Sequence, residues 1–138
     1  MQSTSESSTI SKAKLRTSWV LSGVAILFLL FDCTIHILAP QPVIDSCKQL
    51  GFPLDTIQPL GYVELICLLL YAIPRTAVFG AVLLTGWLGG AIATQLRIGA
   101  PVFSTALFPV YVGVLLWGGL YLRDNRLADL IPVCRAEA

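Results

Sequence analysis

Charged residues are scarce in this chain of 138 residues, at 12%, whereas hydrophobic residues make up 56%. So little polar material cannot coat a soluble globule, which excludes a water-soluble domain. The net charge is only +1, and no basic stretch is interleaved with aromatic side chains, so no nucleic-acid partner is expected. The Gly-x-Ser-x-Gly, phosphate-loop and His-Glu-x-x-His motifs are missing as well. Enzymatic activity of the isolated chain is therefore not expected.

Metal-ligating residues are also few. The chain has a single histidine, His36, which excludes a haem pair and a multi-histidine metal site, so the sequence predicts no metal centre. Four cysteines occur without any Cys-x-x-Cys spacing, so neither a zinc site nor a dithiol redox motif is encoded locally. They are Cys33, Cys47, Cys67 and Cys134. We interpret them as inert thiols, of which only Cys33 and Cys67 could be neighbours.

What the chain does contain is four apolar runs close to the roughly 20 residues that cross a bilayer. They predict an all-α membrane four-helix bundle whose spans lie at about 17–39, 58–73, 76–96 and 103–122. This transmembrane domain, 17–123, follows a disordered tail at 1–16 and precedes a second tail at 124–138. The segment between the first two spans is expected to be the longest loop. Pro109 either kinks the fourth helix or delays its start to about Leu107.

Lysine and arginine gather on one side of this topology. Seven of them fall on the side of the two termini, and only Lys48 and Arg97 fall on the other. Basic residues near span ends are retained in the cytoplasm, so we predict that both termini are cytoplasmic. Cys47 and Cys134 then lie on opposite sides of the membrane and cannot pair.

Gly86 and Gly90 form a small-xxx-small pair on the third span. Such a pair lets two helices approach closely in lipid. It favours packing within the bundle, with a homodimer through the same residues as the alternative.

Five polar side chains fall in or beside the outer halves of three spans: Asp32, His36, Glu64, Gln95 and Arg97. Asp32 and His36 are four residues apart and therefore share a helix face. Because an ionised side chain in hydrocarbon costs about 3 kcal/mol without partners, we expect these groups to share a polar pocket that opens outward. Such a pocket would bind a small polar or quinone-like headgroup, or exchange protons with one. The alternatives are that Asp32 and His36 only fasten helices together and that Glu64 only contacts lipid headgroups.

Six segments form a combined pattern: LGFP at 50–53, ELIC at 64–67, IPRTA at 73–77, GGA at 89–91, PVY at 109–111 and WGGLYLR at 117–123. Together they resemble the DoxX-like family of small bacterial membrane proteins. The resemblance covers about 19–132 and implies a four-helix protein of the bacterial cytoplasmic membrane, distantly related to DoxX subunits of quinone-linked sulfur oxidation. Relatives often carry a lysine at the position of His36 and a histidine at that of Gln95, so this chain departs from the family at two polar positions.

These observations favour a small-ligand binding or accessory subunit of a membrane redox system, with quinone-like or lipid-like ligands and membrane redox proteins as partners. A proton-coupled transporter is the first alternative, and it would need a dimer because four helices are few for alternating access. A purely structural or assembly subunit is the second.

Overall fold

The computed structural model describes residues 12–130, and the side chains of 12–127. Every regular element in this part of the chain is a helix, and four helices are long and apolar enough to cross a membrane, which confirms the predicted all-α four-helix fold. The outer positions of the tails predicted at 1–16 and 124–138, namely 1–11 and 131–138, lie outside the described residues.

The four long helices are α1 (Lys12–Leu38), α3 (Ile57–Ala72), α4 (Ala77–Arg97) and α5 (Phe108–Arg123). A 3₁₀ turn at Leu54–Thr56 leads into α3, and a π-helical stretch at Val102–Ala106 precedes α5. Two short helices, α2 (Gln41–Gln49) and α6 (Asn125–Leu130), lie outside the spans.

Two elements differ from the expected ones, and a third follows one of two predicted arrangements. Helix α1 begins at Lys12, so residues 12–16 extend the first helix and are not part of a tail. The segment expected to be a long loop contains α2, which begins after Pro40. Helix α5 begins at Phe108 with Pro109 in its first turn, where the missing N–H of proline removes no helical hydrogen bond. Of the two predicted arrangements around Pro109, the structure therefore shows the later start.

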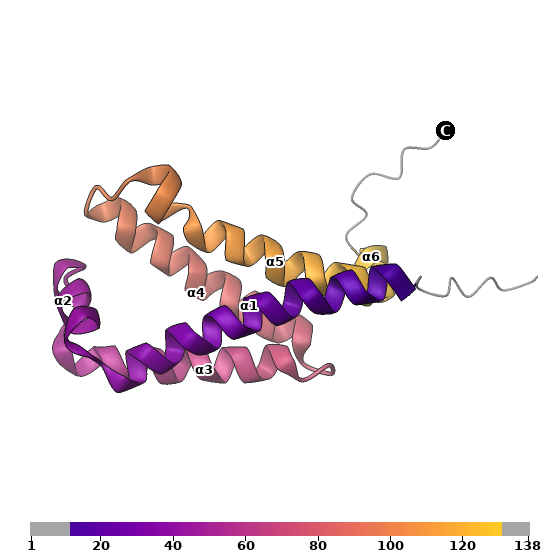
Figure 1. The fold of residues 1–138 in the computed structure, drawn as a ribbon, viewed down its shortest axis with the longest axis horizontal. Coiled ribbons are helices and arrows are strands. Elements are labelled where there is room, and N and C mark those ends of the chain that lie inside the picture. Colours follow the sequence, from indigo (N-terminus) through magenta and orange to yellow (C-terminus); the bar gives the residue numbers. More distant parts are fainter. Residues whose placement is uncertain (1–11, 131–138) are drawn as a thin grey trace, which may run out of the picture.

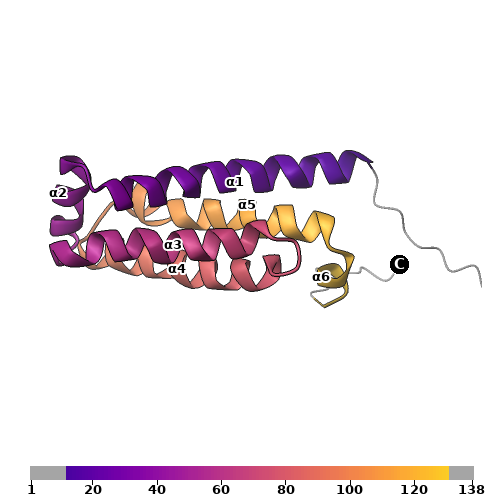
Figure 2. The same cartoon turned by 90° about the horizontal axis from the view of Figure 1, so that it is seen from below.

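The long helices form a closed ring. α1 packs against α3 and α5, and α4 packs against the same two helices from the other side (Figures 1 and 2). Many large apolar side chains on the outside of this ring are more than half exposed, as expected for a surface in contact with lipid. Leu27, Ile66, Phe79 and Val114 are examples.

One end of the bundle is tightly packed. We call it the terminal end, because α1 begins there, α5 ends there, and the short turn between α3 and α4 lies beside them (Figure 1). Tyr71 is 0% exposed here, and its hydroxyl donates a hydrogen bond to the Leu116 carbonyl at 2.8 Å and pairs with Ser22 Oγ at 3.0 Å. Gly80 lies directly against the Tyr71 backbone, and Gly119 lies against the backbone of α1. These glycines let two pairs of helices, α3 with α4 and α1 with α5, meet without intervening side chains.

The opposite end, which we call the α2 end, is open by comparison. Toward it, α4 and α5 diverge from α1 and α3 (Figure 1). A Cβ added at Gly86 or Gly90 would meet nothing within 4 Å. The close intramolecular packing that we expected at this pair is therefore not found. The glycines that do lie against a neighbouring backbone are Gly61, Gly80 and Gly119.

Candidate functional site

A cavity of about 520 Å³ lies within the α2 end. All four long helices line it, together with α2 and the π-helical stretch before α5. Its deep end reaches the core residues Leu29, Leu88 and Val112, and its other end reaches Cys47 and Leu50 of the α2 region. The cavity therefore runs from the centre of the bundle toward one membrane face.

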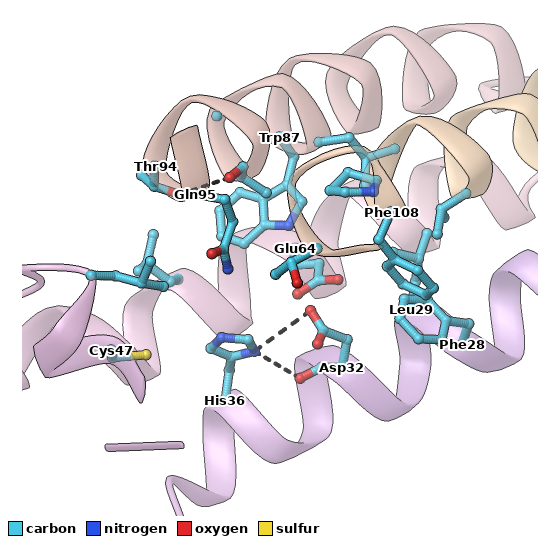
Figure 3. A pocket seen from close by; sticks show the side chains of 18 of the residues that line it. Phe28, Leu29, Asp32, His36, Cys47, Glu64, Trp87, Thr94, Gln95 and Phe108 are labelled. Carbon is cyan, nitrogen blue, oxygen red and sulfur yellow. Dashed lines mark hydrogen bonds and ion pairs between the residues drawn. The ribbon is translucent and has the colours of Figure 1, made fainter. Parts of the chain in front are cut away.

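The walls of the cavity are mostly apolar and partly aromatic. Trp87 projects from α4, opposite Phe28 of α1 and Phe108 of α5 (Figure 3). The rings of Phe28 and Phe108 pack edge to face, with centroids 5.1 Å apart and an interplanar angle of 63°. Three aromatic side chains thus gather on one part of the cavity wall, and a fourth, Phe52, lines the cavity near α2.

Asp32 and His36 bring polar groups to the cavity from one face of α1 (Figure 3). His36 Nδ1 lies 2.9 Å from the Asp32 backbone carbonyl and 3.6 Å from Asp32 Oδ2. Both side chains remain partly accessible, at 21% for His36 and 31% for Asp32. The four-residue spacing therefore produces the contact that the sequence predicted.

Glu64 reaches the same place from α3. Its side chain is 0% exposed, and neither carboxylate oxygen has a hydrogen-bond partner among the described residues. Gly61, one turn earlier, allows this approach: a Cβ there would lie 2.9 Å from His36 Cβ and 3.0 Å from the Cys33 carbonyl. As a result, potential metal-ligand atoms of Asp32, His36 and Glu64 all lie within 4.8 Å of one another.

The remaining two predicted residues are placed differently. Gln95 lines the cavity from the last turn of α4 and points toward His36 and Glu64 (Figure 3). Arg97 is exposed and does not line the cavity; its guanidinium donates a hydrogen bond to the Leu50 carbonyl. Arg97 therefore ties α4 to the end of α2, and the cavity gathers the other four residues.

Several lining residues escaped the sequence analysis. Trp87, Ala91 and Thr94 lie at helical spacing on one face of α4, a pattern that could have been recognised. Ser104 and Thr105 also line the cavity, but they belong to the π-helical stretch, whose side-chain directions ordinary helical spacing does not predict.

The cysteines of the described part of the chain, Cys33, Cys47 and Cys67, are buried free thiols. Cys134 lies outside the described residues. Cys47 is 4% exposed and lines the cavity from α2. Burial, and secondarily the negative charge of Asp32, raises the pKa of the Cys47 thiol above its ordinary value, which favours the unreactive protonated form.

Together, the bundle and its cavity define a class: a small four-helix membrane protein with a mostly apolar internal pocket that contains one polar cluster. The sequence model of the DoxX-like family matches residues 20–119, so the chain belongs to that family, as its sequence resemblance indicated. Neither the comparison with curated proteins nor the comparison with solved structures finds a match.

Proposed function

We propose that this protein binds a small amphipathic molecule, quinone-like or lipid-like, in the cavity of the α2 end, as an accessory subunit of a membrane redox system. The observation that carries the proposal is that one cavity combines aromatic and aliphatic walls with a single polar cluster, formed by Asp32, His36, Glu64 and Gln95. An amphipathic molecule combines the same two kinds of surface.

The size of the cavity suits such a ligand. Small-molecule pockets in proteins typically hold about 300–1,000 Å³ and combine apolar walls with a few well-placed polar groups. The cavity of about 520 Å³ lies within this range. Trp87 and the Phe28–Phe108 pair offer ring faces and edges on which a planar headgroup can stack.

The polar end supplies hydrogen bonds of both kinds. The amide of Gln95 donates and accepts, and Glu64 offers two oxygens that no described protein group uses. His36 and Glu64 can each take up or release a proton, which suits a ligand whose headgroup is protonated when it is reduced. These groups support a quinone-like headgroup over a purely apolar ligand.

Gly86 and Gly90 belong to this proposal as lining residues. Because a side chain at either would project into unoccupied space, we propose that their role is to leave room for the ligand. In this arrangement they are not needed as a homodimer interface. The partner that the proposal requires is a redox protein that loads or unloads the ligand.

We further propose that the protein lies in the bacterial cytoplasmic membrane with both termini inside, so that the α2 end faces outward. Seven lysines and arginines on the side of the termini, against Lys48 and Arg97 on the other, support this orientation. In intact cells, a membrane-impermeant maleimide should label Lys48→Cys and should label Arg75→Cys only after the cells are opened. Because both positions are exposed, each cysteine can react wherever the reagent reaches its side of the membrane. The opposite labelling pattern would show that the termini lie outside.

Quenching of Trp87 fluorescence tests the ligand directly. The chain has three tryptophans, so Trp19→Phe with Trp117→Phe leaves Trp87 as the sole emitter. In this background, decylubiquinone should quench the emission saturably. Glu64→Gln should weaken the apparent affinity about tenfold, because it alters a hydrogen-bonding group in the polar end.

A matched pair of variants on α4 serves as the control. Ala91 lines the cavity, whereas Ala93 is exposed on the outer surface of the bundle and does not line the cavity. Ala91→Phe should abolish saturable quenching, and Ala93→Phe should leave it intact. Equal quenching in both variants, or quenching that rises linearly with quinone, would mean that the probe reaches Trp87 only from the lipid.

A further inference from the structure

Three side chains at the polar end are of the kinds that bind metal ions. Asp32 and His36 project from adjacent turns of α1, and Glu64 faces them from α3 (Figure 3). One potential ligand atom from each lies within 4.8 Å of the other two. Two carboxylates and one imidazole thus share a small volume inside a membrane-embedded bundle.

Glu64 provides an independent observation. It is completely buried, it faces the cavity, and its two oxygens have no hydrogen-bond partner among the described residues. No lysine or arginine lines this cavity, and the nearby Arg97 is engaged by the Leu50 carbonyl. Among the described residues that line the cavity, His36 is then the one side chain that can carry a positive charge, and it can balance at most one of the two carboxylates. An unbalanced carboxylate inside the membrane is costly.

We propose that Asp32, His36 and Glu64 bind a divalent first-row transition-metal ion. Carboxylate oxygens and imidazole nitrogens together suit ions such as Mn²⁺, Fe²⁺ and Zn²⁺. Two carboxylates balance the charge of one such ion, so the occupied site is neutral and much less costly to bury. One histidine excludes a multi-histidine centre but not this mixed set.

The geometry is suitable for an ion between α1 and α3. Ligands four residues apart on a helix point to the same side, which is why this spacing recurs in helical zinc sites. Donors sit about 2.0–2.2 Å from such an ion, so the three groups must move slightly closer together. Asp32 is 31% exposed and has room to rotate, whereas Gly61 holds α3 against α1 at the required depth.

Three protein ligands leave coordination positions open toward the cavity, for water or for an oxygen atom of a bound molecule. The metal site does not depend on the quinone-like ligand. Zn²⁺ binding without any quenching by decylubiquinone would support the metal site and reject the proposed function. Quenching by decylubiquinone without Zn²⁺ binding would support the proposed function and reject the metal site.

The test is equilibrium dialysis of the full chain in detergent micelles. The protein carries a tag without histidine, is treated with a chelator, and is dialysed against Zn²⁺ or Mn²⁺ before the metal is quantified by mass spectrometry. We expect one ion per chain. Glu64→Gln, Asp32→Asn and His36→Gln should each weaken binding by at least about tenfold, because each removes a ligand.

Asp55→Asn is the matched control, since Asp55 is an exposed carboxylate that does not line the cavity. It should retain full stoichiometry and affinity. With Mn²⁺ bound, electron paramagnetic resonance of the unsubstituted chain should show coupling to an imidazole nitrogen. His36→Gln, loaded with Mn²⁺ at a concentration that still fills the site, should bind the ion without this coupling, a result that a loss of folding cannot imitate. Absence of a stoichiometric ion, or binding that survives in both Glu64→Gln and His36→Gln, would overturn the proposal.

Discussion

The two ends of this bundle consist of the same long helices but differ in how closely the helices pack and in how their buried polar groups are bonded. At the terminal end, glycines seat helices against each other and the buried phenol of Tyr71 bonds to two neighbouring helices. At the α2 end, Gly86 and Gly90 face unoccupied space and the buried carboxylate of Glu64 bonds to no described group. The terminal end holds the helices together, whereas the α2 end encloses a cavity in which the Glu64 carboxylate has no hydrogen-bond partner among the described residues.

The difference shows that a small residue in a membrane helix does not by itself mark a packing contact. Its meaning depends on what lies opposite the missing side chain: a backbone for Gly80, open space for Gly90. A buried polar group is equally ambiguous until its partners are known. Even the terminal end contains one unpartnered atom, Ser18 Oγ, but a neutral hydroxyl costs less to bury than a carboxylate.

Adding one methyl group at each end should give the largest contrast. In Gly80→Ala the new Cβ collides with the Tyr71 backbone, so we expect a loss of about 2–3 kcal/mol in stability. In Gly90→Ala the Cβ meets nothing, and the lower flexibility of alanine should add about 0.5 kcal/mol. Thermal unfolding in detergent measures both. A similar loss in the two variants would show that the α2 end is also tightly packed.

Removing the Tyr71 hydroxyl tests the polar network of the terminal end. Tyr71→Phe leaves Ser22 Oγ without its partner and should cost about 2 kcal/mol, measured by the same unfolding experiment. Tyr62→Phe is the control, because Tyr62 is 52% exposed and should tolerate the change. Equal midpoints for the two variants would mean that the network contributes nothing measurable.

Replacing Glu64 should act in the opposite direction. In chelator-treated protein, Glu64→Leu removes a buried group without partners and should raise stability by about 1 kcal/mol. Adding Zn²⁺ at 100 times the Kd of the unsubstituted chain should then stabilise that chain by about 2.7 kcal/mol, and should stabilise Glu64→Leu, whose site is at least tenfold weaker, by no more than about 1.4 kcal/mol. If Glu64→Leu instead unfolds at a lower temperature, the carboxylate fastens the bundle and the structural interpretation of the polar cluster is correct.

Much of this architecture could be predicted because the bilayer imposes simple rules on sequence. Apolar runs of about 20 residues fix the number of spans, and helical spacing places Asp32 beside His36. The convergence of Glu64 and Gln95 on the same level followed from their distances to span ends. These inferences required only the period and rise of a helix.

Other features depend on contacts that no local pattern encodes. The role of Gly61, the open space at Gly90 and the outward position of Arg97 each depend on how two helices lie relative to each other. Helix α2 lies in a segment rich in polar and turn-forming residues, and the π-helical stretch before Pro109 changes the direction of Ser104 and Thr105. The full lining of the cavity therefore required the structure.

The smallest expected effect is on a reaction rate and concerns Cys47, which lines the cavity at the α2 end. Its pKa is raised by burial and by the charge of Asp32, and only the thiolate reacts with maleimides. In a chain whose other cysteines are replaced, the rate of Cys47 labelling should be low at pH 7. The rate should still rise about tenfold per pH unit at pH values above the pKa of an exposed thiol, where the labelling rate of the exposed thiol no longer changes with pH. Lys48→Cys, with Cys47→Ser, provides that exposed reference.

Asp32→Asn should speed labelling of Cys47 modestly at a fixed pH, because it removes the lesser cause of the raised pKa while burial remains. A bound cation at Asp32 should act in the same direction, whereas a molecule that fills the cavity should slow the reaction, so one rate distinguishes the two occupants of the α2 end.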